Sequence, residues 1–130
     1  MCPSINIIHV NGGNNTQKFK AFAAADIFCS LSDNIQETFG ITPIEAMAAG
    51  LPVIVSDRVG CIDDLVNDEE TGLIVKSDLP EALFCAMARL ASYPILRSRM
   101  GEAAERLICH WTLENEASNV LAAWRYGMTL

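Results

Sequence analysis

Short apolar runs alternate along this chain with segments of helical periodicity, and this alternation restricts the fold more than any other feature. The clearest run is PVIVS at 52–56, which is apolar up to Ser56. Such a run is typical of a strand in a parallel sheet that is covered on both faces. Strands that alternate with helices indicate βαβ units. The sequence therefore predicts an α/β fold, a Rossmann-like open parallel sheet with helices on both faces.

The apolar pattern and the turn residues set the expected boundaries of these elements. Strands are predicted at 5–10, 27–31, 52–56 and 73–75, and helices at 16–26, 42–50, 61–66, 78–91, 94–109 and 113–126. Gly50 and Pro52 are expected to end the helix at 42–50. The helix at 78–91 opens with Asp78 and Glu81 at capping-box spacing. Its apolar residues recur at helical intervals: Leu79, Leu83, Met87 and Leu90.

Composition limits the classes of function that this chain can have. Its 130 residues make one ordinary domain, and the net charge of −7 argues against nucleic-acid binding. No apolar run is long enough to span a membrane, and the N-terminus does not have the pattern of a signal peptide. Hydrophobic residues make up 51% and charged residues 19%. Because this is apolar for a free-standing domain, we expect that another part of a larger protein covers some of its surface.

The five cysteines are odd in number and widely spaced, without a CxxC pair. This pattern favours a reduced, cytoplasmic protein whose cysteines are mostly small core residues. No metal-ligand spacing occurs, so we expect neither a metal site nor a cofactor. His9 and His110 are isolated in the sequence and are expected to be structural.

The segment ETFGITPIEAMAAG places Glu37 and Glu45 on either side of Gly40 and Pro43. Because neither Gly40 nor Pro43 suits a helix interior, Glu37 is expected on a loop and Glu45 in the first turn of the following helix. The free N–H groups of that helix start form an anion site, which Gly40 lets a phosphate approach closely. The two carboxylates could then accept hydrogen bonds from sugar hydroxyls. A phosphate between two hydroxyl-bearing rings describes a nucleotide sugar.

The spacing alone also allows simpler interpretations of both glutamates. Thr42, Pro43 and Glu45 fit a capping box in which Glu45 bonds back to the Thr42 N–H. Glu37 fits an ordinary solvated loop carboxylate. The residues by themselves leave these alternatives open.

The stretch ADIFCSLSD…ETFGITPIEAMAAGLPVIVSD…GCIDDLV…ETGLIV resembles the C-terminal, donor-binding domain of retaining GT-B glycosyltransferases of group 1 (glycosyltransferase family 4). The resemblance implies that Glu45 holds the nucleotide ribose and that Glu37 contacts the donor sugar, as the two residues of the catalytic site. It implies that the backbone of the intervening segment holds the diphosphate: Phe39, Gly40, Ile41 and Thr42. It also places the loop Val10–Gly12 near the nucleotide base, and no metal is required. The chain departs from the common pattern at Thr38, where glycine is frequent.

By this resemblance, residues 1–130 are a nucleotide-sugar donor-binding domain and a fragment of a larger two-domain enzyme. The acceptor domain and the basic phosphate-binding residues would precede it, so the fragment alone is expected to be inactive. We expect its exposed last helix, with Leu121 and Trp124, to favour self-association. The full-length enzyme would be cytoplasmic or peripheral to a membrane. Two alternatives stay open: a nucleotide-sugar epimerase of the same fold, and a non-catalytic α/β binding module.

Overall fold

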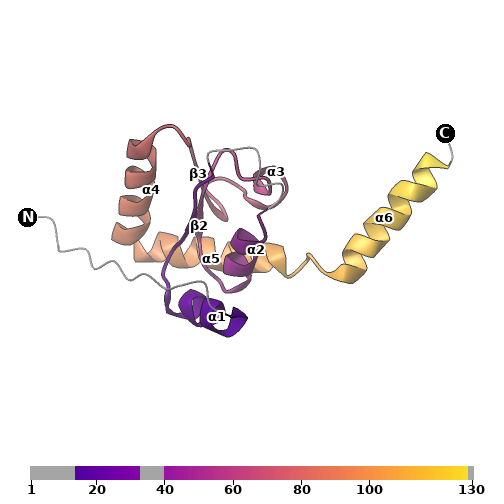
Figure 1. The fold of residues 1–130 in the computed structure, drawn as a ribbon, viewed down its shortest axis with the longest axis horizontal. Helices are drawn as coiled ribbons and strands as arrows, with labels where there is room; N and C mark the ends of the chain where they lie inside the picture. The colour runs from indigo at the N-terminus through magenta and orange to yellow at the C-terminus, as the bar shows by residue number, and fades with distance from the viewer. Residues whose placement is uncertain (1–13, 33–39, 129–130) are drawn as a thin grey trace, which may run out of the picture.

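The computed structural model describes residues 14–32 and 40–128 as alternating helices and strands (Figure 1). In chain order the elements are α1 (Asn15–Ala24), β1 (Phe28–Ser30), α2 (Ile41–Ala48), β2 (Val53–Ser56), α3 (Ile62–Leu65), β3 (Gly72–Val75), α4 (Pro80–Ser92), α5 (Pro94–Ile108) and α6 (Leu113–Gly127). All predicted elements after residue 13 are confirmed to within a few residues. The strand predicted at 5–10 lies outside the described residues.

The strands form one parallel sheet in the order β1-β2-β3, so the apolar β2 is central. Its four residues are all fully buried. Successive side chains of a strand point to opposite faces. Accordingly, Val53 and Val55 join one core cluster, whereas Ile54 joins another. A central strand that is buried on both faces is expected to be apolar, as Val53, Ile54 and Val55 are, and the buried Ser56 at its end has its hydroxyl hydrogen-bonded.

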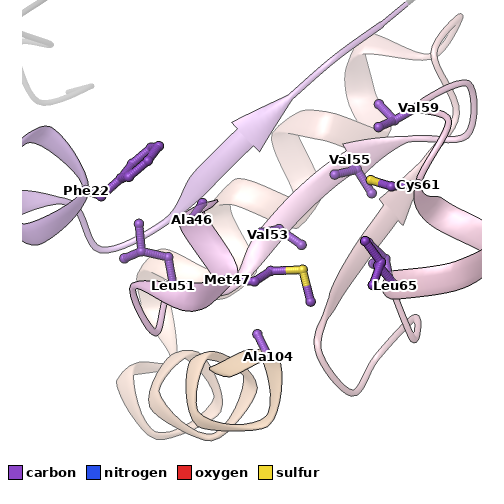
Figure 2. Packing of buried hydrophobic residues seen from close by; sticks show 11 residues of the cluster. Phe22, Ala46, Met47, Leu51, Val53, Val55, Val59, Cys61, Leu65 and Ala104 are labelled. Atoms are coloured by element: carbon purple, nitrogen blue, oxygen red, sulfur yellow. The ribbon is translucent and has the colours of Figure 1, made fainter. Parts of the chain in front are cut away.

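Helices cover both faces of this sheet, which confirms the predicted fold class. The first cluster joins the sheet to α1, α2, α3 and Ala104 of α5, and Met47 lies near its centre, between Val53 and Ala104 (Figure 2). The second cluster joins the opposite face to α4 and α5 through Ala86, Leu90 and Met100. In Figure 1, α4 accordingly lies on the other side of the strands from α2 and α3.

Two glycines let α2 and α5 pack closely. Gly50 ends α2 in the left-handed conformation, with φ +74°, and its N–H bonds to the Met47 carbonyl at 3.0 Å. The Leu51 N–H bonds to the Ala46 carbonyl at 3.1 Å, which completes a Schellman motif. On α5, a Cβ added to Gly101 would lie 2.1 Å from the Gly50 carbonyl oxygen. Glycine at 101 therefore allows backbone-to-backbone contact between the two helices.

The start of α4 differs from its prediction. The N-cap is Leu79, whose side chain makes no cap hydrogen bond, and Pro80 is the first helical residue. The capping box of Asp78 and Glu81 is therefore wrong. Proline is favoured at the first helical position, where its missing N–H costs nothing, so Pro80 moves the boundary one residue past the place the box requires.

The apolar face of α4 and the cysteines also need correction. Ala86 and Leu90 face the sheet, whereas Leu79 and Met87 remain 50% and 45% exposed.

Of the four cysteines that the structure describes, only Cys61 is buried. The remaining three, Cys29, Cys85 and Cys109, are exposed, so the prediction of mostly core cysteines is wrong. Their positions on outward-facing sides of the elements were not visible in the spacing.

Helix α6 extends away from the body of the domain (Figure 1), and none of its residues is buried. Its exposed large apolar side chains include Leu121 at 51% and Trp124 at 63%. This is the surface on which we expected self-association, which stays a prediction. No helix within 14–32 and 40–128 is long and apolar enough to cross a membrane.

Candidate functional site

The carboxyl ends of the three parallel strands meet at one edge of the sheet, where ligands bind in folds of this class. Polar residues follow each strand at this edge: Ser32 after β1, Asp57 after β2, and Lys76 and Ser77 after β3. Helix α2 also begins at this edge, because it follows the exit of β1. The predicted site residues from Gly40 to Glu45 are therefore placed where the sheet topology favours binding.

The first turn of α2 is open to a ligand. Gly40 is its N-cap in the left-handed conformation, with φ 78°, and no side chain of the described residues makes a cap hydrogen bond there. The first N–H groups of a helix have no partner within the helix, and they attract anions. Ile41 is 67% exposed, and Thr42 is also exposed, so this end of the helix faces outward. Glycine at 40 adopts the left-handed turn without steric cost.

The capping box of Thr42, Pro43 and Glu45 is wrong. Helix α2 begins at Ile41, so Thr42 is already its second residue and makes no cap hydrogen bond. Pro43 is accommodated in the first turn, where an N–H is not needed. The left-handed Gly40 turns the chain into the helix earlier than the sequence indicated. Glu45 is consequently the fifth residue of α2, one turn from the helix start, rather than within the first turn.

One oxygen of the Glu45 carboxylate is hydrogen-bonded among the described residues, and the other is not. Oε1 accepts a hydrogen bond from Nζ of Lys18, on α1, at 2.6 Å. Oε2 is buried and has no hydrogen-bond partner among the described residues. A buried acceptor without a partner costs about 1–3 kcal/mol. This oxygen, one turn from the helix start, can accept a hydrogen bond from a ligand hydroxyl once the groups that cover it move.

Ser56, at the carboxyl end of β2, is hydrogen-bonded to the backbone of Ser32, just after β1. Its side chain is fully buried, and its Oγ accepts the Ser32 N–H at 2.9 Å and donates to the Ser32 carbonyl at 2.6 Å. Ser32 is the last described residue before the segment that carries Glu37 and Phe39. Those two predicted site residues lie outside the described residues, as does the loop Val10–Gly12.

Asp57 links the exits of β2 and β3. Its Oδ2 accepts from Lys76 Nζ at 2.9 Å, and its Oδ1 accepts the Ser77 N–H at 3.1 Å. The hydrogen bond from Lys76, followed by the one from Ser77, holds the pKa of the Asp57 carboxyl below its ordinary value of 3.8. Because its pKa is lower in the folded state, the ionised carboxylate stabilises the fold at pH values above the pKa of the unfolded chain. This stabilisation is lost as the pH falls through the pKa of the folded state.

We therefore expect Asp57→Asn to lower the free energy of unfolding at pH 7, and the deficit to shrink below pH 3.8 as the wild-type carboxyl takes up its proton. Urea unfolding followed by circular dichroism across this pH range measures both effects. Lys76→Met should likewise cause a stability deficit that shrinks at acid pH, because it removes the same Lys76–Asp57 ion pair. An Asp57→Asn deficit that stayed constant from neutral to acid pH would contradict this account.

The acidic segment 67–70 forms a turn whose carboxylates have specific partners. Asp68 Oδ1 accepts the Ile74 N–H at 2.9 Å, and both Glu69 oxygens lie 2.6 Å from Arg89 nitrogens. The Arg89 guanidinium lowers the pKa of Glu69. Because this turn precedes β3, it lies at the opposite edge of the sheet from the candidate site.

A hollow of about 170 Å³ opens at the candidate edge of the sheet. Its lining comes from the exits of β1 and β3 and from α4: Leu31, Ser32, Val75, Lys76, Ser77, Leu79, Pro80 and Leu83. No residue of α2 contributes, so the hollow is separate from Glu45.

Among the described residues no three His, Cys, Asp or Glu side chains gather as metal ligands. His110 Nδ1 lies 2.8 Å from the Arg106 carbonyl oxygen, a contact within the α5 terminus that fits its expected structural role.

The profile of the family described as "Glycosyl transferases group 1" matches residues 3–107. The chain belongs to this glycosyltransferase family. The match contains all residues of the candidate site, from Lys18 on α1 to Ser77 after β3. The resemblance to group 1 glycosyltransferases drawn from the sequence is therefore confirmed.

Similar proteins and structures agree with this family. The chain is 34% identical over 115 residues to the lipopolysaccharide core biosynthesis mannosyltransferase LpsB of Rhizobium meliloti. The matched region covers 86% of this chain and 32% of that protein. It is 31% identical to sucrose-phosphate synthase from Thermosynechococcus elongatus, with a TM-score of 0.70 over 84% of this chain and 27% of that one. The C-terminal domain of a group 1 family protein, LpcC, from Francisella tularensis has the same fold, with a TM-score of 0.65 at 24% identity over 79% of this chain and 50% of that one. The chain thus spans about a third of its relative LpsB.

Sequence reasoning missed two residues of the candidate site, Lys18 and Ser56. Lys18 meets Glu45 across 27 residues of sequence, and Ser56 meets Ser32 across 24. Neither residue has a local signal, because one is a lysine on a polar helix and the other ends an apolar strand. The position of Ser56 at the carboxyl end of β2 was the only available indication, since side chains at that edge surround ligands in parallel sheets.

Proposed function

We propose that this chain is the donor-binding domain of a retaining group 1 glycosyltransferase, which moves a sugar from a nucleoside diphosphate to an acceptor. The observation that carries the proposal combines two features of α2: its left-handed start at Gly40, an N-cap without a side chain, and the Glu45 carboxylate oxygen one turn later, which has no hydrogen-bond partner among the described residues. The first suits a diphosphate, and the second suits a hydroxyl of the ribose.

In this proposal the backbone from Phe39 to Thr42 holds the diphosphate, and the helix dipole stabilises the charge that develops on it as the sugar leaves. Glu45 accepts the ribose hydroxyls, and Glu37 accepts hydroxyls of the transferred sugar. The chain has a net charge of −7, so attraction of the diphosphate must come from local N–H groups and from basic residues outside this chain. The acceptor would bind to a separate domain that precedes this one, and no metal takes part.

Titration of the full-length protein with uridine, guanosine and adenosine diphosphates tests the proposal. We expect one of the three to bind measurably by isothermal titration calorimetry and to bind equally well after treatment with a chelator. Binding by one of them would also identify the base. If none binds, the donor-site proposal is wrong and a non-catalytic binding module is favoured.

A turnover assay separates the transferase from the epimerase. With the matching nucleotide sugar, a glycosyltransferase releases nucleoside diphosphate in the presence of an acceptor, whereas an epimerase changes the sugar without moving it to an acceptor. Retention is read from the anomeric configuration of the product by nuclear magnetic resonance. An inverted product would contradict the retaining assignment while leaving the donor site intact.

A further inference from the structure

The ion pair between Lys18 and Glu45 joins α1 to α2 beside the proposed nucleotide site. Nζ of Lys18 lies 2.6 Å from Oε1 of Glu45, and the two side chains are 35% and 23% exposed. The pair is only partly shielded from solvent, so it adds little to stability, but the short contact fixes the position of Oε1. The domain has seven more acidic than basic side chains, yet it places a lysine on this carboxylate.

The Lys18 ammonium is also held from its own helix. Nζ lies 5.5 Å from the centre of the Phe19 ring, within the range of a cation–π contact. Phe19 packs edge-on against Phe22, with ring centres 6.4 Å apart, and Phe22 packs edge-on against Phe28 at the start of β1. Phe22 is buried in the first core cluster. The position of the ammonium is thus tied through the aromatic rings to the sheet itself.

We propose that Lys18 is a positioning residue for the nucleotide: it anchors the Glu45 carboxylate through Oε1 so that Oε2 is presented to the ribose diol. This inference rests on the proposed function. An ionised carboxylate has about four acceptor sites, and Lys18 uses one of them. Oε2 has no partner in the described residues, so it can take one ribose hydroxyl while Oε1 takes the other. Because Oε2 is buried, the groups that cover it must move on binding, and the anchored Oε1 keeps the carboxylate oriented during that movement.

The test compares three variants of the full-length protein by isothermal titration calorimetry. Lys18→Met removes the ammonium and keeps an apolar stem of similar length. Lys20→Met is the matched control, because it makes the same charge change on the exposed side of the same helix. Lys18→Arg keeps a charged donor at the site. The ligands are uridine, guanosine and adenosine diphosphate, followed by the 2′-deoxy form of whichever binds tightest.

We expect Lys18→Met to weaken binding roughly tenfold, Lys20→Met to change it less than about twofold, and Lys18→Arg to restore most of the loss. We also expect the penalty for removing the 2′-hydroxyl to shrink in Lys18→Met, because the carboxylate no longer holds the geometry that recognises that hydroxyl. A lysine that only stabilises the fold would not alter this discrimination. Melting temperatures of all variants show whether the fold is retained.

Three results would overturn the inference. Wild-type affinity in Lys18→Met would show that the anchor is not needed, and tighter binding would show that the lysine competes with the ribose. An unchanged 2′-deoxy penalty in Lys18→Met would show that the lysine acts only on the fold. In each case weaker binding by Glu45→Gln would leave the proposed function standing. If no diphosphate binds to the wild-type protein, both proposals fail together.

Discussion

Glu45→Gln is expected to weaken binding of the nucleoside diphosphate by about 1–3 kcal/mol, which is roughly 5- to 150-fold. A carboxylate offers only acceptors and can take both ribose hydroxyls through charge-assisted bonds. The amide loses the charge and one acceptor, and it no longer forms the ion pair with Lys18. The stability of the domain should change little, because the pair is partly exposed and Glu45 does not cap its helix. Calorimetry in the full-length protein measures the affinity, and thermal unfolding measures the stability.

Glu37→Gln is the informative comparison, because the proposal assigns it to the other ring. It should leave binding of the bare diphosphate unchanged and should reduce turnover of the nucleotide sugar. Glu116→Gln, on the exposed α6, makes the same chemical change away from the site and should alter neither. If Glu37→Gln weakens the bare diphosphate as much as Glu45→Gln does, the assignment of one glutamate to each ring is wrong.

Gly101→Ala is expected to destabilise the domain by about 1–3 kcal/mol. The new Cβ would lie 2.1 Å from the Gly50 carbonyl oxygen and 3.3 Å from Cδ of Pro52. The closest atom belongs to the backbone, so no side-chain rotation relieves the overlap and α5 must move away from α2. Because α2 also carries Glu45, a shift of that helix should weaken diphosphate binding as well. Urea unfolding gives the stability, and the same titration gives the affinity.

Gly127→Ala provides the control for this substitution. A Cβ at Gly127 meets nothing within 4 Å, and the residue ends a helix with no buried residues. Alanine there should leave the stability of the domain unchanged. Equal stability of Gly101→Ala and wild type would show that α2 and α5 can separate without cost, which would contradict the close packing described above.

The sequence alone predicted the elements, the parallel sheet and the family. These features depend on local patterns: the apolar run at 52–56, the glycine and proline that end α2, and the motif around Gly40. A buried central strand must be apolar whatever packs against it, and Gly50 takes its left-handed turn because other residues pay a steric cost there. Such requirements can be read without knowing the neighbours in space.

Only the tertiary structure decided how the candidate site is held together. Lys18 reaches Glu45 and Ser56 reaches Ser32 across more than 20 residues of sequence, and no periodicity encodes such contacts. The helix starts were also decided in three dimensions: the left-handed Gly40 replaced the capping box at Thr42, and Pro80 replaced the one at Asp78. A capping box states which bonds are possible, whereas the backbone path into the helix determines which of them form. The sequence identified Glu45 as a residue that could bind a ligand. The fold determined that Oε1 pairs with Lys18 and that Oε2 has no partner among the described residues.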